Sequence, residues 1–174
     1  MIAIIPVAGA GTNLRPHTYT QPKSLIPVAG KPILGYIIEQ LLENGIKDFV
    51  FVIGYLGEKI KEYVESSYPS IQKKYVVQEV REGLGHAIWL TKNAIPKKSE
   101  VMIVLGDTII DVDWKKFMAL SGTALAVKKV TDPRKFGVVE FDNLGNIIKV
   151  VEKPNIPKSN MALVGLYKIK EFDI

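Results

Sequence analysis

A glycine-rich stretch with two basic residues follows the first apolar run of the chain. Residues 7–32 read VAGAGTNLRPHTYTQPKSLIPVAGKP. Glycine lets backbone amides approach a ligand closely, and Arg15 and Lys23 add positive charge to the same stretch. Pro16 and Pro22 disfavour a helix here, so we expect a long irregular loop. This combination predicts binding of a polyanion, with ordinary surface charge as the alternative.

The two commonest phosphate-binding loops fit this stretch poorly. The pattern Gly-x-Gly-x-x-Gly would need a third glycine where Leu14 stands, and it would have to open a helix directly. A Walker loop needs Gly-Lys followed by Ser or Thr, whereas Lys31 is followed by Pro32. Binding of a nicotinamide dinucleotide is therefore disfavoured.

Apolar runs alternate with amphipathic segments over most of the chain. Strands are predicted where short apolar runs occur, and helices where apolar residues recur at helical spacing. This alternation favours a parallel sheet with helices on both faces, which is a three-layer α/β/α arrangement. The expected strands are 2–7, 49–53, 75–79 and 101–105, and the expected helices are 32–45, 56–67 and 84–95.

The last third of the chain has a different pattern. After a short helix near 114–120, four strand-like runs follow with no long helix between them, at 123–130, 136–141, 147–153 and 162–169. We expect antiparallel strands here, on a sheet that is mixed and mostly parallel overall. No linker or repeat interrupts the sequence, so we predict a single domain over residues 1–174. Its nucleotide-binding part would cover about 1–110 and the remainder about 111–174.

The composition narrows the partners and the compartment. The net charge is +5, but lysines and arginines are scattered, so a small anionic ligand is favoured over nucleic acid, with solvated surface charge as the alternative. Cysteine is absent, which excludes disulfides and thiolate chemistry and fits a cytoplasmic location. No signal peptide and no membrane-spanning helix are expected.

Several motifs in order resemble the sugar-1-phosphate nucleotidylyltransferases. The family signature is Gly-x-Gly-Thr-Arg-Leu-Arg-Pro, then Pro-Lys, then Pro-Val-x-x-Lys-Pro, and the matching pieces here lie at 9–16, 22–23 and 27–32. Further matches follow along the chain. They are Gln78 with 83–87, 105–107, 132–133 with 136–140, 152–154 and 165–167.

The resemblance implies a Rossmann-like fold and a specific reaction. A hexose-1-phosphate, glucose-1-phosphate being the first choice, would attack the α-phosphorus of dTTP or UTP, and pyrophosphate would leave. Mg²⁺ is the implied cofactor, the two substrates are the implied partners, and a homo-oligomer is compatible with the family. The implied roles are catalysis for Arg15 and Lys23, metal binding for Asp107, nucleotide binding for Ala8, Gly9, Ala10, Gly11, Thr12, Asn13, Gln78 and Gly83, and sugar-phosphate binding for Gly137, Glu152, Lys153, Gly165 and Tyr167.

Two departures from the family pattern keep a second interpretation open. Asn13 stands where the family usually has an arginine, so a bidentate cation is lost, although Arg15 lies two residues further on. The chain also ends at Ile174, before the segment where family members carry a second metal-binding aspartate. We therefore expect either part of a longer protein or a domain that lost its end. The alternative function is a non-catalytic binding relative or a regulatory module.

Overall fold

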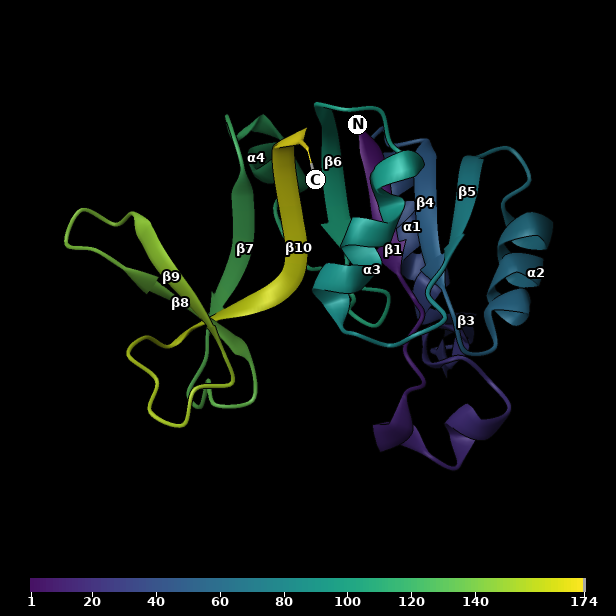
Figure 1. Ribbon diagram of the computed structural model, residues 1–174, viewed down its shortest axis with the longest axis horizontal. Helices are drawn as coiled ribbons and strands as arrows, with labels where there is room; N and C mark the ends of the chain where they lie inside the picture. The colour runs from purple at the N-terminus through teal and green to yellow at the C-terminus, as the bar shows by residue number, and fades with distance from the viewer. Residues whose placement is uncertain (174) are drawn as a thin grey trace. The chain divides into compact units, whose positions relative to one another are not determined.

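The computed structural model describes residues 1–173 and divides the chain into two compact units (Figure 1). Unit 1 comprises Met1–Ala124 together with the segment from Tyr167 onward, and unit 2 comprises Leu125–Leu166. In the part of the chain that the structure describes, no helix is long and apolar enough to cross a membrane.

Unit 1 is built on the predicted parallel sheet. Strand β1 (Ile2–Pro6) pairs in parallel with β4 (Asp48–Ile53) on one side and with β6 (Ser99–Val104) on the other, and β5 (Gln72–Val77) pairs in parallel with β4. The order is β5-β4-β1-β6, and β10 (Met161–Phe172) follows β6. Strand β5 begins and ends earlier than expected, so Gln78 lies just past its carboxyl end.

Helices cover both faces of this sheet. Figure 1 shows α3 (Leu84–Leu90) in front of the strands and α1 (Ile33–Glu43) behind them, with α2 (Gly57–Ser67) beside β5. Helix α1 buries Leu34, Ile37, Ile38 and Leu41 completely or nearly so, and each such side chain stabilises the fold by roughly 1.5–3 kcal/mol. On the α3 side, Ala87 packs into a core with residues of β1, β4 and β6. The three-layer prediction is confirmed.

The two shortest α-helices, α3 and α4, agree with their predicted ranges to different degrees. Helix α4 covers Trp114–Ala119, close to the prediction. Helix α3 was expected to run to residue 95, but it ends at Leu90 and continues as a 3-10 turn over Thr91–Asn93. The buried Thr91 hydroxyl donates to the carbonyl of Ile88 at 2.7 Å, a local bond that competes with regular helix geometry.

Unit 2 has the antiparallel strands expected in the last third. Strand β8 (Gly137–Phe141) pairs with β9 (Ile147–Glu152), and β10 pairs with β8 at Ala162 and Val138. Strand β7 (Ala124–Lys129) pairs with β10. The β8–β9 turn is held by Asp142, whose Oδ1 accepts from the amides of Leu144 and Asn146 at 2.9 and 2.8 Å.

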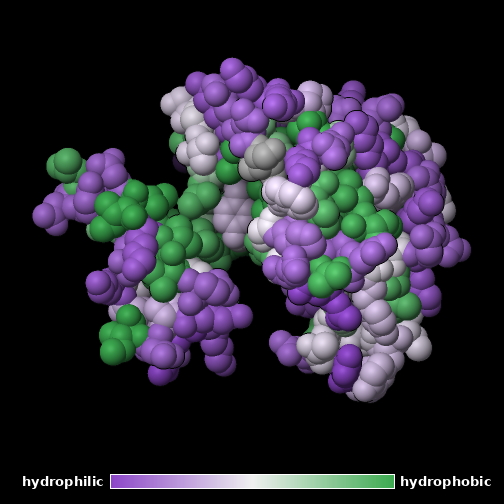
Figure 2. All heavy atoms as spheres, viewed as in Figure 1, coloured by the Kyte–Doolittle hydropathy of each residue, from purple (hydrophilic) through white to green (hydrophobic). Residues whose placement is uncertain are grey.

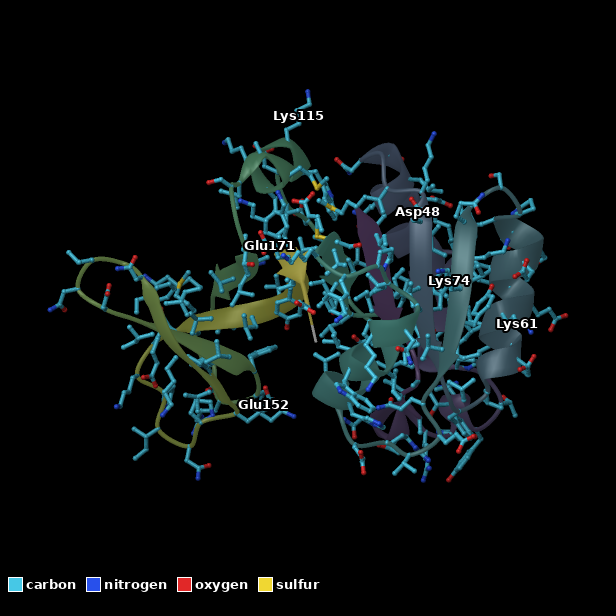
Figure 3. The ribbon with its side chains drawn as sticks, turned by 45° about the horizontal axis from the view of Figure 1, so that its top comes forward. Asp48, Lys61, Lys74, Lys115, Glu152 and Glu171 are labelled. Carbon is cyan, nitrogen blue, oxygen red and sulfur yellow. The ribbon has the colours of Figure 1, made fainter. Side chains whose placement is uncertain are left out.

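Surface properties of the two units differ. Apolar side chains gather among polar ones over β8 and β9 in Figure 2, and Ile147, Ile148 and Val150 of β9 are exposed. On unit 1, Lys61, Lys74 and Lys115 lie on three different elements, α2, β5 and α4 (Figure 3). These three lysines do not form a cluster, which agrees with the scatter of basic residues along the sequence.

Candidate active site

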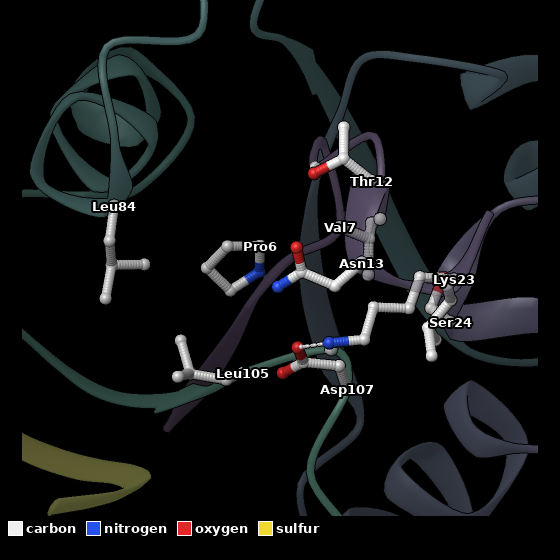
Figure 4. A pocket seen from close by; sticks show the side chains of 13 residues that line it. Pro6, Val7, Thr12, Asn13, Lys23, Ser24, Leu84, Leu105 and Asp107 are labelled. Atoms are coloured by element: carbon white, nitrogen blue, oxygen red, sulfur yellow. Dashed lines mark hydrogen bonds and ion pairs between the residues drawn. The ribbon is translucent and has the colours of Figure 1, made fainter. Parts of the chain in front are cut away.

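A cavity of about 350 Å³ opens beyond the carboxyl ends of β1 and β6. This is where open parallel sheets place their ligands. Figure 4 shows Asn13, Lys23 and Asp107 around the open space, with Leu84 lying across it from Lys23. The lining comprises Pro6, Val7, Gly9, Gly11, Thr12, Asn13, Leu14, Lys23, Ser24, Leu84, Leu105, Gly106 and Asp107.

The loop after β1 is irregular, as predicted, and is made of three single 3-10 turns. These are η1 (Thr12–Leu14), η2 (His17–Tyr19) and η3 (Lys23–Leu25). Gly11 has φ +59°, and a Cβ there would lie 2.8 Å from Thr18 Cγ2 and 3.0 Å from Lys23 Cβ. The buried Thr18 hydroxyl donates to the Gly11 carbonyl at 2.8 Å. A glycine is thus required where the three turns meet, and this close packing carries Lys23 to the cavity.

A cation and a carboxylate face each other in the cavity. Lys23 Nζ donates to Asp107 Oδ2, and the two side chains are 37% and 39% exposed (Figure 4). Asp107 reaches this position because the turn after β6 lies against the turn after β1: a Cβ on Gly106 would clash with Val7 Cγ1. A bound polyanion would draw the ammonium and repel the carboxylate unless a divalent cation accompanied it.

Gly9 leaves room for a ligand at the rim of the same cavity. It lines the open space, and a Cβ there would meet no protein atom within 4 Å. Backbone amides beside such an open face can approach a phosphate without side-chain interference. Gly9 therefore leaves space for a ligand in the cavity, whereas Gly11 is needed for the close packing of the loop.

Seven residues of the lining were not predicted as site residues: Pro6, Val7, Leu14, Ser24, Leu84, Leu105 and Gly106. Ser24 is 4% exposed, and its Oγ has no hydrogen-bond partner within residues 1–173. Leu84 supplies an apolar wall from the start of α3. Ser24 follows Lys23 directly, which was the one available signal, while no sequence pattern singled out Leu84 as a lining residue.

Three residues predicted for the loop lie outside the lining. Ala8 and Ala10 are buried and contribute by packing. The exposed Arg15 places its guanidinium 5.1 Å from the centre of the Tyr19 ring, a cation–π contact. The Tyr19 carbonyl in turn accepts from the Tyr55 hydroxyl at 3.0 Å. Of the two basic residues predicted for catalysis, the structure brings Lys23 to the cavity and stacks Arg15 on the loop.

Gln78 and Gly83 lie together near the Leu84 wall. Gln78 follows β5, is 5% exposed and donates from Nε2 to the Gly83 carbonyl at 3.1 Å. Gly83 has φ +91° and immediately precedes α3. Two residues expected to contact the base are therefore in direct contact with each other.

In unit 2, the structure brings three of the predicted sugar-phosphate residues together. Gly137 and Glu152 are cross-strand partners, and a Cβ on Gly137 would lie 3.1 Å from Glu152 Oε2. Lys153 Nζ lies 3.4 Å from Glu152 Oε1, and its amide donates to the Phe136 carbonyl at 3.0 Å. Gly165 is buried in β10 of the same unit, whereas Tyr167 belongs to unit 1 and packs on its core.

The donor set at Asp107 fits magnesium that arrives with a phosphate ligand. Among residues 1–173, no group of three or more His, Cys, Asp or Glu side chains could hold a metal. Mg²⁺ is commonly bound by one or two carboxylates, with waters and substrate phosphates as its other ligands. A single exposed carboxylate in a cavity suits that mode and does not suit a metal held by protein ligands alone.

Comparison with known proteins gives consistent matches over nearly the whole chain. Residues 2–171 match the family model described as nucleotidyl transferase. The bifunctional protein GlmU of Methanococcus vannielii is 38% identical over 99% of this chain, which spans 41% of that relative. The UTP–glucose-1-phosphate uridylyltransferase AglF of Haloferax volcanii is 33% identical over 96% of this chain, which spans 71% of it. A UDP-glucose pyrophosphorylase structure with UDP-glucose superposes with TM-score 0.85 at 27% identity, covering 97% of this chain and 75% of its own.

Proposed function

This chain belongs to the nucleotidyl transferase family, and on that premise we propose that it makes a nucleotide sugar from a pyrimidine nucleoside triphosphate and a hexose-1-phosphate. UTP or dTTP is the nucleotide, and glucose-1-phosphate is the first sugar to test. The uridylyltransferase name of one relative and the UDP-glucose held by a similar structure support this choice. The observation that carries the proposal is a cavity that combines a glycine loop with Lys23 and Asp107.

The proposed reaction needs no covalent enzyme intermediate. An oxygen of the sugar phosphate forms a bond to the α-phosphorus of the triphosphate, and the bond from that phosphorus to the bridging oxygen of the β-phosphate breaks. Pyrophosphate leaves with the bond electrons, so the step is neither an oxidation nor a reduction. Such a transfer depends on in-line positioning and on positive charge along the phosphates.

Each side of the reaction has its own residues in this proposal. Backbone amides of Gly9, Ala10, Gly11 and Thr12 hold the triphosphate, and Lys23 neutralises charge between the reacting phosphates. Asp107 holds Mg²⁺, which supplies further charge neutralisation when bound. On the sugar-phosphate side we assign Gly137, Glu152, Lys153, Gly165 and Tyr167, with Glu152 accepting from hydroxyls and Lys153 pairing with the phosphate.

Asn13 supports a second candidate, a relative that binds nucleotide or sugar phosphate without turnover. Its amide lines the cavity but carries no charge, and the exposed Arg15 stacks on Tyr19 instead of lining the cavity. Charge neutralisation then falls mainly to Lys23 and the metal.

One panel separates the two candidates. Pyrophosphate release is measured with magnesium for four nucleoside triphosphates against several hexose-1-phosphates, beside equilibrium binding of each nucleotide. The transferase proposal predicts turnover that is fastest with UTP or dTTP. Tight pyrimidine nucleotide binding with no pyrophosphate above background contradicts it and supports the binding relative.

A further inference from the structure

His86 lies between an amide and a carboxylate beside the residues proposed to contact the base. Its Nδ1 is 3.3 Å from Gln78 Nε2 and 3.5 Å from Glu82 Oε2. The imidazole is 22% exposed and stacks on Trp89 with ring centres 6.1 Å apart. A single ring nitrogen therefore has a hydrogen-bond donor and a hydrogen-bond acceptor within reach, and it can satisfy only one of them at a time.

The neighbours of Gln78 determine which way its side-chain amide faces. The Gly83 carbonyl accepts only, so the amide nitrogen must be on that side, where the distance is 3.1 Å. When His86 Nδ1 carries no proton, it accepts the second hydrogen of the same nitrogen. Both amide hydrogens are then committed to protein acceptors, and the group that Gln78 can offer a ligand is its carbonyl oxygen.

A carbonyl oxygen at this position selects bases by the proton on N3. Uracil and thymine carry an N3–H that can donate to it, whereas N3 of cytosine is itself an acceptor and would face the oxygen without a proton between them. We propose that His86 is a positioning residue for base selection: its unprotonated Nδ1 holds Gln78 in the orientation that favours UTP and dTTP over CTP. This inference rests on the proposed function.

Protonation of His86 would remove that constraint. A protonated Nδ1 points a hydrogen at the Gln78 amide nitrogen, so two donors face each other, and the same hydrogen can be given to Glu82 instead. Reversing the amide would satisfy His86 but would place the Gln78 oxygen against the Gly83 carbonyl. Neither orientation then satisfies all partners, so the preference for UTP requires an Nδ1 that carries no proton.

The test measures the ratio of dissociation constants for CTP and UTP by calorimetry, in the wild-type chain and in two variants of His86. The triphosphate groups of the two nucleotides are alike, so their contribution cancels in the ratio. The wild-type chain should prefer UTP about tenfold more strongly than a variant without the acceptor, which is the worth of one hydrogen bond. His86→Phe keeps an aromatic ring on Trp89 but has no acceptor, so it should show the lower preference.

His86→Asn is the matched variant, because its amide oxygen can accept the same hydrogen of Gln78. It should keep the wild-type preference. A purely structural role for His86 would instead change both affinities together and leave their ratio unmoved.

The outcomes separate this inference from the proposed function. If wild-type chain binds neither nucleotide, the proposed function fails. If it prefers UTP and the ratio is the same in His86→Phe, the inference fails while the proposed function stands. Should the Phe variant not fold, nitrogen NMR of the wild-type imidazole at about pH 8 decides, since the inference requires a proton on Nε2 and none on Nδ1. A proton on Nδ1 overturns it.

Discussion

At the scale of single residues, the contact between Lys23 and Asp107 controls the charge of the cavity. The pair is partly exposed, so its own contribution to stability is small and its importance lies in what it presents to a ligand. Without ligand, the Asp107 carboxylate is paired with the Lys23 ammonium. A bound triphosphate must replace Asp107 as the partner of Lys23, and a divalent cation must then neutralise the carboxylate.

Asp107→Asn should therefore separate binding from turnover. The substitution removes a negative charge and frees Lys23, so UTP without metal should bind more tightly, by about tenfold. Pyrophosphate release with magnesium should fall by at least about a hundredfold, because the metal ligand is lost. Calorimetry and a pyrophosphate assay measure the two effects.

Asp111→Asn is the matched control, since Asp111 is exposed and lies outside the cavity lining. It should leave both quantities unchanged. Full magnesium-dependent turnover in Asp107→Asn would remove Asp107 from the metal site.

Gly9 and Gly11 should respond differently to the same substitution. Gly11→Ala places a Cβ in the left-handed region and against Thr18, so we expect a loss of about 1–3 kcal/mol in the free energy of unfolding. Gly9→Ala meets no protein atom and should change stability by less than about 0.5 kcal/mol. Its methyl group should nevertheless weaken UTP binding. Urea unfolding and UTP titration of both variants check this, and the reverse pattern would contradict the roles assigned to the two glycines.

Some predicted site residues lie together in the structure and others do not. Lys23 and Asp107 were predicted, and the structure brings them to one cavity, which is the placement their proposed roles require. Arg15 was predicted on the same basis, but its side chain stacks on Tyr19, a tertiary contact that no local pattern specifies. Ser24 and Leu84 line the cavity through packing alone, so residue chemistry did not single them out.

At the scale of elements, a buried lysine connects three segments of unit 1. Lys168 of β10 is 5% exposed, and its Nζ donates to the carbonyls of Met118 and Leu120 at 2.9 and 2.8 Å, near the end of α4. The same ammonium lies 3.2 Å from Glu100 of β6. The positive charge thus satisfies carbonyls at the carboxyl end of a helix, where the helix dipole also favours it.

Lys168→Met should destabilise the chain by about 2–4 kcal/mol, because it leaves the carbonyls of Met118 and Leu120 and the carboxylate of Glu100 without their buried partner. Lys170→Met is the control, since Lys170 is exposed two residues further along the strand, and it should cost less than about 0.5 kcal/mol. Equal unfolding midpoints in urea for the two variants would show that Lys168 does not hold these elements together.

A second element-scale feature is the turn before β8, held by Asp132 and Arg134. Arg134 donates from its backbone amide, Nε and Nη2 to the Asp132 carboxylate, and these bonds lower the pKa of Asp132 to about 2. Because the folded pKa lies below the unfolded value, the stabilisation is present above about pH 4 and is lost as the pH falls toward about 2.

Carbon NMR of the carboxylates should find Asp132 still ionised at about pH 3, where an ordinary aspartate is mostly protonated. In Arg134→Gln the pKa of Asp132 should rise toward the ordinary range of an aspartate. A wild-type midpoint near pH 4 would contradict the contact.

Helices and strands whose apolar residues recur at a regular spacing were predicted well, whereas irregular segments were not. The buried faces of α1 and β4 follow their apolar repeats closely. The three 3-10 turns after β1 have no repeat, and their geometry depends on Gly11, Thr18 and Lys23 packing together across the loop. Helix α3 ends at Leu90, where the Thr91 hydroxyl bonds to the Ile88 carbonyl, and a helical pattern does not reveal such a local bond.

At the scale of the whole molecule, the fold class followed from the order of strands and helices, whereas the division into units did not. Strand β10 carries residues of both units, with the change between Leu166 and Tyr167. The apolar residues of β10 continue across this division, so the sequence pattern does not reveal it. The expected boundary near residue 110 separates a nucleotide-binding part from a sugar-phosphate part, while the compact units divide after Ala124.

The central claim is that the glycine loop, Lys23 and Asp107 hold the triphosphate of a nucleotide. A crystal structure of the chain with UTP and magnesium tests it most directly. We predict phosphate oxygens within hydrogen-bonding distance of Lys23 Nζ and of backbone amides in residues 9–12, with the metal on Asp107 and the base beside Gln78. UTP bound to another part of the molecule, with this cavity holding only solvent, would contradict the account.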